Sequence, residues 1–235
     1  MAPVVLCIEQ QPSAPVARLG PLLSDAGFEV RVAPAPGGLS QGDLEHCSGI
    51  VVLGGEMGCH DSAEYPWLLD EVGLIQKAHE QQIPVLGICL GGQLVAQALG
   101  GRVLAGARHE IGWFDAEVTV DDPLLGPPGE GKQFLWHSDA FEPPPGAEAL
   151  VSGRVPGRAP LAFRCGTSYG LQFHPEVTPE LVAGWVATGD VELAELGVDA
   201  GALVAATAQH DRHYQRQARR IAEGFAALIA ARRRS

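Results

Sequence analysis

The stretch IPVLGICLGGQ, residues 83–93, sets a cysteine between a strand-like and a helical pattern. Residues 83–88 are apolar like a buried strand, and residues 91–99 repeat apolar side chains at helical spacing up to a Gly-Gly stop. The glycines around Cys89 leave room for a sharp turn in which the central residue takes a strained backbone conformation. We therefore expect Cys89 at the top of a sheet, beside a helix start whose free NH groups favour its thiolate and can hold an oxyanion.

The segments before this turn alternate between strand-like and helical patterns. Apolar runs at residues 3–9 and 49–53 and the alternating pattern of residues 28–33 are typical of strands, and residues 14–26 and 65–82 have the spacing of helices. Such alternation with short connections predicts an α/β fold with a doubly wound, mostly parallel sheet. Ligands of such sheets gather at the carboxyl ends of the strands, where Cys89 falls.

The chain changes character after Arg102. Five strand-like segments follow, at residues 102–105, 113–120, 132–136, 161–165 and 169–173, and we expect some of them to form a small antiparallel extension. After Pro179 the chain is rich in Ala, Leu, Glu and Arg, which indicates two or three helices with breaks at Gly189 and residues 197–201. We predict one domain over residues 1–180 and a C-terminal helical tail, residues 181–235, packed on that domain.

The composition excludes several classes of protein. With 235 residues, 46% of them apolar, the chain can bury one substantial core. It has no apolar run near the ~20 residues that cross a bilayer, and no base precedes Glu9, so we expect a cytoplasmic protein without a secretory signal or membrane contact. The net charge of −12 repels nucleic acids. Five scattered cysteines without a CxxC pair indicate reduced thiols rather than disulfides or a zinc ribbon.

A second motif, GLQFHPE at residues 170–176, ends an apolar strand with His174 and Glu176. A thiolate that attacks an amide needs an imidazole to manage the proton, and the imidazole needs a carboxylate to fix its tautomer. Pro175 restricts the backbone between the two side chains. Taken alone, Cys89 has a plainer explanation as a small buried residue, and His174 as a satisfied histidine at a strand end. The two motifs together favour a Cys-His-Glu triad.

GICLGGQ at 87–93 and QFHPE at 172–176 resemble the paired signature of class I glutamine amidotransferases, in the order and approximate separation of that family. The resemblance covers residues 4–180, and EIGW at 110–113 and WHSD at 136–139 look like the glutaminase domain of GMP synthase. It implies a flavodoxin-like fold with Cys89 as nucleophile, His174 as base and Glu176 orienting that base. No metal or organic cofactor is implied.

The resemblance also implies roles for residues around the triad. Gly54 and Gly55 match the family's oxyanion loop, so the NH groups of Gly55 and Leu90 would hold the oxygen of the tetrahedral intermediate. The implied substrate-binding residues are Gly54, Gln93, Ser138 and Asp139. As plain sequence, the Gly-Gly and Ser-Asp pairs would be only turns. EMG at residues 56–58 departs from the Pro-containing loop common in the family, which leaves that loop's contacts open.

The implied reaction is hydrolysis of the γ-carboxamide of glutamine through a Cys thioester, which releases ammonia and glutamate. We recognise no ATP-binding or synthase domain, so we expect a separate synthase to take the ammonia, or the chain to act alone. The alternative enzyme is a free-standing γ-glutamyl peptidase or hydrolase with the same triad. A third interpretation is a non-catalytic binding or regulatory protein, against which the intact triad residues count. Apolar residues of the tail would pack on the domain or on a second copy in a homodimer.

Three other groups of residues are candidates for further sites. Cys59, His60 and Asp61 are adjacent and rarely converge on one ion, so we expect them to border the pocket. His210 and His213 have helical spacing for a metal, and a solvated face is the favoured interpretation. The same holds for a basic stripe that could bind an anion, formed by Arg212, Arg216, Arg219 and Arg220.

Overall fold

The computed structural model describes residues 2–107, 109–153 and 159–233. Within these residues, one sheet has nine strands in the order β2-β1-β3-β4-β11-β10-β9-β6-β7, and β5 and β8 form a separate pair. The strands are β1 Val4–Glu9, β2 Glu29–Pro34, β3 Cys47–Val52, β4 Val85–Ile88, β5 Arg102–Leu104, β6 Glu110–Val118, β7 Gly129–His137, β8 Ala140–Glu142, β9 Glu148–Gly153, β10 Ala162–Cys165 and β11 Ser168–Leu171. The helices are α1 Leu19–Asp25, α2 Trp67–Glu80, α3 Leu90–Ala98, α4 Pro179–Thr188, α5 Asp190–Glu195 and α6 Ala200–Arg232, with short 3-10 turns at Ala35–Gly37 and Gln41–Leu44.

The sheet divides into a parallel and an antiparallel half. Strands β2, β1, β3, β4 and β11 pair in parallel, whereas β10, β9, β6 and β7 continue the sheet in antiparallel pairs. The predicted doubly wound, mostly parallel α/β fold with an antiparallel extension is therefore confirmed. Strand β11 belongs to the parallel half, and its residue Leu171 lies opposite Ile88 of β4. This register brings the segments after both strands to the same edge of the sheet.

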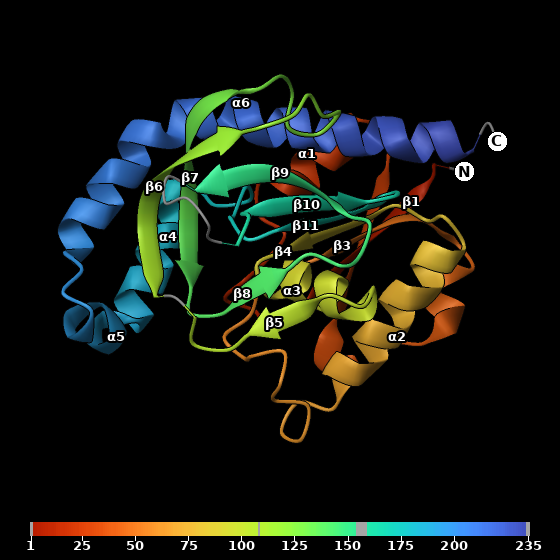
Figure 1. Cartoon of the computed structure of the whole chain (residues 1–235), viewed down its shortest axis with the longest axis horizontal. Coiled ribbons are helices and arrows are strands. Elements are labelled where there is room, and N and C mark those ends of the chain that lie inside the picture. The colour runs from red at the N-terminus through yellow and green to blue at the C-terminus, as the bar shows by residue number, and fades with distance from the viewer. Residues whose placement is uncertain (1, 108, 154–158, 234–235) are drawn as a thin grey trace.

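Helices cover both faces of the parallel half (Figure 1). Side chains alternate along β1, so that Val5 and Cys7 pack in one core with residues of α1 and α6, while Leu6 and Ile8 pack in the other with residues of α2 and α3. All four side chains are fully buried. The continuous apolar run at residues 3–9 is explained by this burial on both faces.

Helix α1 begins later than its sequence pattern suggests. The helical spacing predicts a start near Ala14, but the helix starts at Leu19. Pro15 disfavours helical backbone at the residue before it, and Ala17 has a positive φ of 40°. The segment is held instead by the Val16 N–H, which donates to the Glu9 carboxylate at 2.9 Å. A loop therefore follows β1 at the edge of the sheet.

The tail packs against the rest of the chain in two places. One is the core between the sheet and α1, which includes Ala218, Ile221, Phe225 and Ile229 of α6. Nearer its start, α6 packs with α4, α5 and β7 in a third cluster formed by Phe134, Val177, Val182, Leu193, Leu203 and Tyr214. The described helices include none that is both long and apolar enough to cross a membrane.

Candidate active site

Cys89 occupies a strained turn between β4 and α3. It is the N-cap of α3 with φ 52° and ψ −112°, a conformation that L-residues seldom adopt. The turn depends on its glycines, because a Cβ on Gly91 would overlap the carbonyl of Val52 and one on Gly87 would overlap the carbonyl of Gly91. The Cys89 N–H donates to the Leu171 carbonyl at 2.7 Å, which ties this turn to the end of β11.

The second motif places an imidazole and a carboxylate in direct contact. His174 Nδ1 lies 2.7 Å from Glu176 Oε1, and both side chains are buried. The backbone N–H of His174 donates to the Phe134 carbonyl at 3.0 Å, and the ring packs edge-on against Trp185. Because Nδ1 is engaged by the carboxylate, Nε2 is left as the nitrogen that can exchange a proton.

Charge dominates the protonation of His174. Burial by itself lowers the pKa of His174, but the negative charges of Glu176 and of the Cys89 thiolate outweigh burial and raise the pKa above its usual range. The imidazolium is thus favoured when the sulfur is a thiolate. Gln172 adds a polar contact, since its amide Nε2 lies 3.8 Å from Cys89 Sγ. On another side, Cys89 Sγ lies 3.7 Å from the backbone carbonyl oxygen of Trp136.

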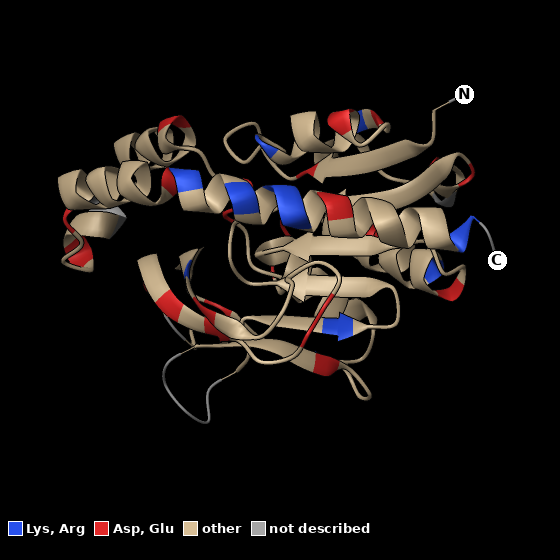
Figure 2. Ribbon diagram, turned by 90° about the horizontal axis from the view of Figure 1, so that it is seen from above, with Lys and Arg blue, Asp and Glu red and all other residues tan. Residues whose placement is uncertain are grey.

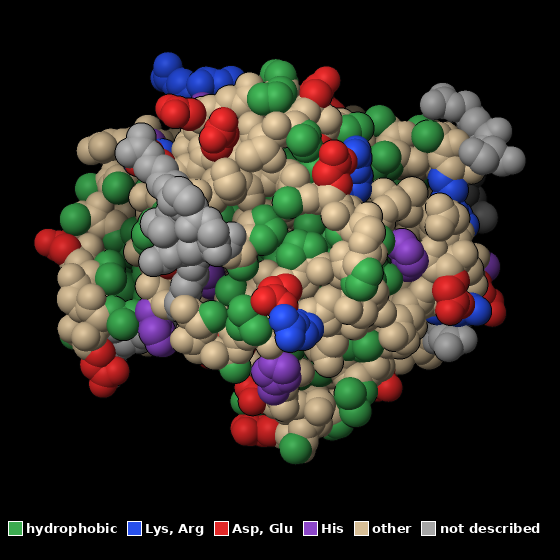
Figure 3. Space-filling model, in the orientation of Figure 1, with side chains coloured by type: hydrophobic (Ala, Val, Ile, Leu, Met, Phe, Trp, Pro, Cys, Tyr) green, Lys and Arg blue, Asp and Glu red, His purple; other side chains and the backbone are tan. Residues whose placement is uncertain are grey.

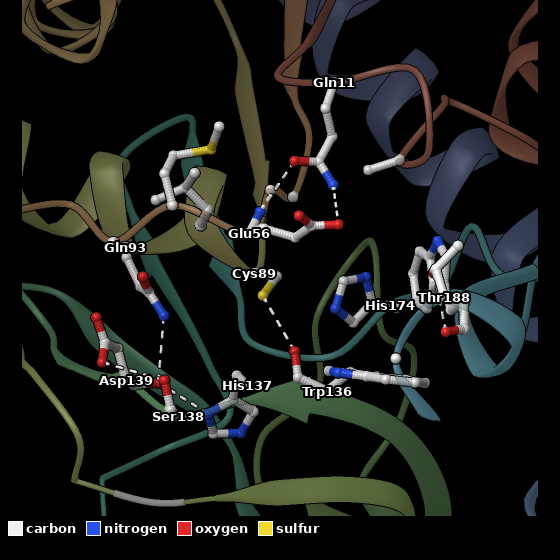
Figure 4. A pocket seen from close by; sticks show the side chains of 18 of the residues that line it. Gln11, Glu56, Cys89, Gln93, Trp136, His137, Ser138, Asp139, His174 and Thr188 are labelled. Atoms are coloured by element: carbon white, nitrogen blue, oxygen red, sulfur yellow. Dashed lines mark hydrogen bonds between the residues drawn. The ribbon is translucent and has the colours of Figure 1, made fainter. Parts of the chain in front are cut away.

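Cys89 and His174 border the same cavity, which has a volume of about 650 Å³. Gly54 lies between them, since a Cβ there would be 3.2 Å from His174 Cε1 and 3.5 Å from Cys89 Cβ. In Figure 4 the sulfur and the imidazole ring stand side by side in this cavity. The structure therefore brings together the two sequence motifs that predicted the triad.

The predicted oxyanion residues line the same cavity as Cys89. Leu90 is the first residue of α3, and Gly55 follows the end of β3; both line the cavity. The loop after Gly55 is held from outside, because the Glu56 N–H donates to Gln11 Oε1 at 3.3 Å and Gln11 Nε2 donates to Glu56 Oε1 at 2.9 Å. The two hydrogen bonds fix the conformation of this loop, whose sequence, EMG at residues 56–58, lacks the expected proline.

The predicted substrate residues gather on one side of Cys89 (Figure 4). Gln93 is buried, and its Nε2 donates to the backbone carbonyl of Asp139 at 3.2 Å. The Asp139 side chain accepts from the Gly106 N–H at 2.8 Å, and Ser138 Oγ lies 3.4 Å from Asp139 Oδ1. Gln93, Ser138 and Asp139 line the cavity and provide polar groups at this end, and Gly54 lines it between Cys89 and His174.

The other end of the cavity was not predicted from the sequence. Its wall includes Trp136 of β7 and residues of the tail, namely Trp185, Thr188, Gly189 and Glu195. The two tryptophan rings meet edge to face with centroids 5.8 Å apart. Trp136 falls in the WHSD motif, but no local pattern marks the tail residues, because their place depends on how α4 and α5 fold back across the edge of the sheet.

The remaining candidates do not form a second centre. Cys59 is buried with its thiol 3.7 Å from Gln93 Oε1, whereas His60 contacts the Val103 carbonyl and Asp61 accepts from the Gly58 N–H. His210 packs on the ring of Trp113. Across the described parts of the chain, no group of three or more His, Cys, Asp or Glu side chains is arranged to hold a metal ion.

The basic stripe of the tail lies on a solvent-facing side of α6. Arg212, Arg216, Arg219 and Arg220 are exposed, and Figure 2 shows the basic bands along the middle of this helix. On the face drawn in Figure 3, the coloured charged side chains are dispersed in small groups of both signs. A solvated face remains the favoured interpretation for the stripe.

Comparison with known proteins gives one family. Residues 20–183 match the model of the family described as glutamine amidotransferase class-I. The glutamine-hydrolysing GMP synthase of Alcanivorax borkumensis is 39% identical over 120 residues, which make up 46% of this chain and 23% of that protein. One subunit of the glutamine-hydrolysing GMP synthase of Haloarcula marismortui is 41% identical over 116 residues, 46% of this chain and 59% of the relative.

The same family emerges from the solved structures. The crystal structure of a glutamine amidotransferase from Thermotoga maritima has a TM-score of 0.87 and 28% identity, over 96% of this chain and 99% of that one. The chain spans less than two thirds of each of the two GMP synthase relatives, 23% and 59%. The predicted likeness to GMP synthase is confirmed by these relatives. The chain belongs to the class-I glutamine amidotransferase family.

Proposed function

We propose that this chain hydrolyses the γ-carboxamide of glutamine through a thioester on Cys89. The observation that carries the proposal is the shared cavity, where Cys89 at its strained turn faces the buried His174–Glu176 pair. A nucleophile and a base in one cavity, with a carboxylate that orients the base from behind, are what acyl transfer requires. The polar groups at the Gln93 end offer contacts for the α-amino and α-carboxylate groups of a glutamyl substrate.

The first half of the reaction forms the thioester and releases ammonia. The Cys89 thiolate attacks the γ-carbonyl carbon, and the NH groups of Gly55 and Leu90 hold the oxygen that becomes negative. His174 gives its Nε2 proton to the amide nitrogen, the C–N bond breaks and ammonia leaves. A raised His174 pKa helps this step, since the ring begins it protonated.

The second half regenerates the enzyme. Neutral His174 takes a proton from water, the hydroxide attacks the thioester carbon, and the C–S bond breaks to return the Cys89 thiolate and free glutamate. Glu176 holds the Nδ1 proton throughout, so the imidazole presents Nε2 in both halves. The sum is glutamine and water converted to glutamate and ammonia.

The ammonia would pass to a separate synthase. The Haloarcula marismortui relative is one subunit of a GMP synthase, and the Alcanivorax borkumensis relative is a much longer GMP synthase. By analogy with these relatives, we propose that the ammonia released by this chain serves a synthase on another polypeptide.

A second candidate is a γ-glutamyl peptidase or hydrolase that uses the same triad. The observation that favours it is the wall of the cavity beyond His174, where Trp136, Trp185 and Thr188 leave space past the scissile bond. A volume of about 650 Å³ lies within the roughly 300–1,000 Å³ that encloses larger ligands than one amino acid. A substituent on the γ-nitrogen would occupy that end.

One experiment separates these functions. Ammonia and glutamate release is measured with glutamine and with a panel of γ-glutamyl amides and dipeptides, using wild type and Cys89→Ala. Turnover of glutamine with little turnover of the dipeptides supports the first function, and the reverse preference supports the second. If no compound is hydrolysed and a diazo-ketone analogue of glutamine does not label Cys89, a non-catalytic binding role replaces both.

A further inference from the structure

A fully buried carboxylate lies behind the proposed oxyanion loop. Glu71 of α2 has no solvent exposure, and both of its oxygens accept from the amide Nε2 of Gln10, at 2.7 and 2.8 Å. Gln10 follows β1 and is 1% exposed. Its Oε1 accepts from the indole Nε1 of Trp67 at 3.3 Å. The Gln10 side chain is thus held from two sides by residues of one helix.

This held side chain is in contact with Gly55. A Cβ on Gly55 would lie 2.5 Å from Met57 Sδ, 2.9 Å from Gln10 Cβ and 3.1 Å from Gln10 Cγ, so the Cα of Gly55 faces the methylene groups of Gln10 with no room for a side chain between them. Gly55 is one of the two residues to which the proposed mechanism gives the oxyanion. The position of its N–H is therefore limited by where the Gln10 side chain lies.

The arrangement costs folding free energy that packing alone does not explain. Burial raises the pKa of Glu71 to about 7, and the Gln10 hydrogen bonds only partly oppose that shift. An apolar side chain would fill the same space without burying a carboxylate that has a single donor. Costly buried polar groups of this kind are found where geometry must be fixed.

We propose that Glu71 is a positioning residue for the reaction, because its carboxylate fixes Gln10 and Gln10 fixes the Gly55 backbone at the oxyanion site. The proposal rests on the proposed function. Oxyanion stabilisation depends on donors that are already in place when charge develops, so a small movement of Gly55 weakens it. Glu71 does not touch the substrate and acts only through Gln10.

The test compares two reagents that modify Cys89. Iodoacetamide alkylates a thiolate without an oxyanion, whereas the diazo-ketone analogue of glutamine places its carbonyl where the γ-carboxamide would lie. Labelling rates with both reagents are measured for wild type, Glu71→Leu and the control Gln76→Ala. Gln76 lies on the same helix and donates a comparable hydrogen bond, at 3.1 Å, to the Ala98 carbonyl.

We expect Glu71→Leu to slow diazo-ketone labelling by on the order of tenfold, less than the roughly 10²–10³ lost with an oxyanion donor. Iodoacetamide labelling should stay close to that of wild type, and Gln76→Ala should change neither rate. Gln10→Met keeps the methylene groups against Gly55 but removes the amide, so it should produce the same split if Glu71→Leu does not fold. Equal slowing with both reagents, or no slowing with either, would overturn the positioning role.

The same measurements distinguish failure of the positioning role of Glu71 from failure of the proposed function. Absence of glutamine turnover in wild type argues against the function, while the ratio of the two labelling rates still reports on Gly55. If wild type turns over substrate, Glu71→Leu should lower kcat with little change in KM, because the affected interaction is made in the transition state. A change confined to KM would contradict the proposal.

Discussion

The parallel half of the sheet and the C-terminal helices contribute different things to the cavity. The parallel strands β3, β4 and β11 end side by side and carry the residues to which we assign the chemistry. Helices α4 and α5 cross the same edge and supply Trp185, Thr188 and Glu195 to the far wall. From this difference we propose that residues of the sheet carry out the reaction, whereas the tail limits the size of the substrate.

The largest expected effect lies in the parallel half. Cys89→Ala removes the nucleophile, so the rate should fall by roughly 10⁴-fold or more, as for other triads. The fold should be kept, since alanine is smaller than cysteine. Cys165→Ala is the matched control because Cys165 lies on β10 away from the cavity. Steady-state ammonia release checks both variants, and activity that survives in Cys89→Ala would refute the assignment.

A smaller loss is expected from the carboxylate. Glu176→Gln leaves Cys89 and His174 in place but no longer stabilises the imidazolium, so kcat should fall by about 10²–10³-fold. Because the charge of Glu176 raises the His174 pKa, the variant should lower that pKa. The imidazolium is then lost at lower pH, and the alkaline limb of the kcat/KM profile should move toward acid. A profile that keeps its alkaline limb would exclude this role for Glu176.

The parts of the molecule that were predicted from sequence share one property. The turn at Cys89 and the strand before His174 are encoded by neighbours in the chain: glycines that clear the turn, apolar runs that form strands, and Pro175 between the two functional side chains. Parallel pairing of the strands then brings them to one edge. Local patterns suffice where a general rule of sheet topology supplies the long-range step.

The residues that were missed depend on packing between distant segments. Glu71 looks like any acid of an amphipathic helix until Gln10, 61 residues earlier, is placed beside it. Trp185 likewise becomes a wall residue only when α4 folds across the sheet edge, where its ring lies 5.2 Å from that of His174. No spacing rule relates such pairs, so the end of the cavity formed by the tail could not be predicted from the sequence.

The contribution of the tail can be measured by filling its end of the cavity. Thr188→Trp adds bulk at the end of α4, so kcat/KM for γ-glutamyl dipeptides should fall by on the order of tenfold, and by less for glutamine. Ala187→Trp adds the same bulk one residue earlier, at an exposed position outside the cavity wall, and serves as control. An equal loss for both substrates in Thr188→Trp would mean that the tail does not select substrate size.

The smallest expected effect is that of Glu71→Gln, which changes how the free energy of unfolding depends on pH. The folded-state pKa of Glu71 is about 7 against an ordinary value of 4.5, so its contribution to stability is fully present below about 4.5 and is lost as pH rises through 7. Glutamine cannot ionise. The free energy of unfolding of the variant relative to wild type should therefore rise between these values, by about 3 kcal/mol at most. Urea unfolding at several pH values measures it, with Gln76→Ala as a control that should give a constant difference. A constant difference for Glu71→Gln as well would mean that folding does not raise the pKa of Glu71.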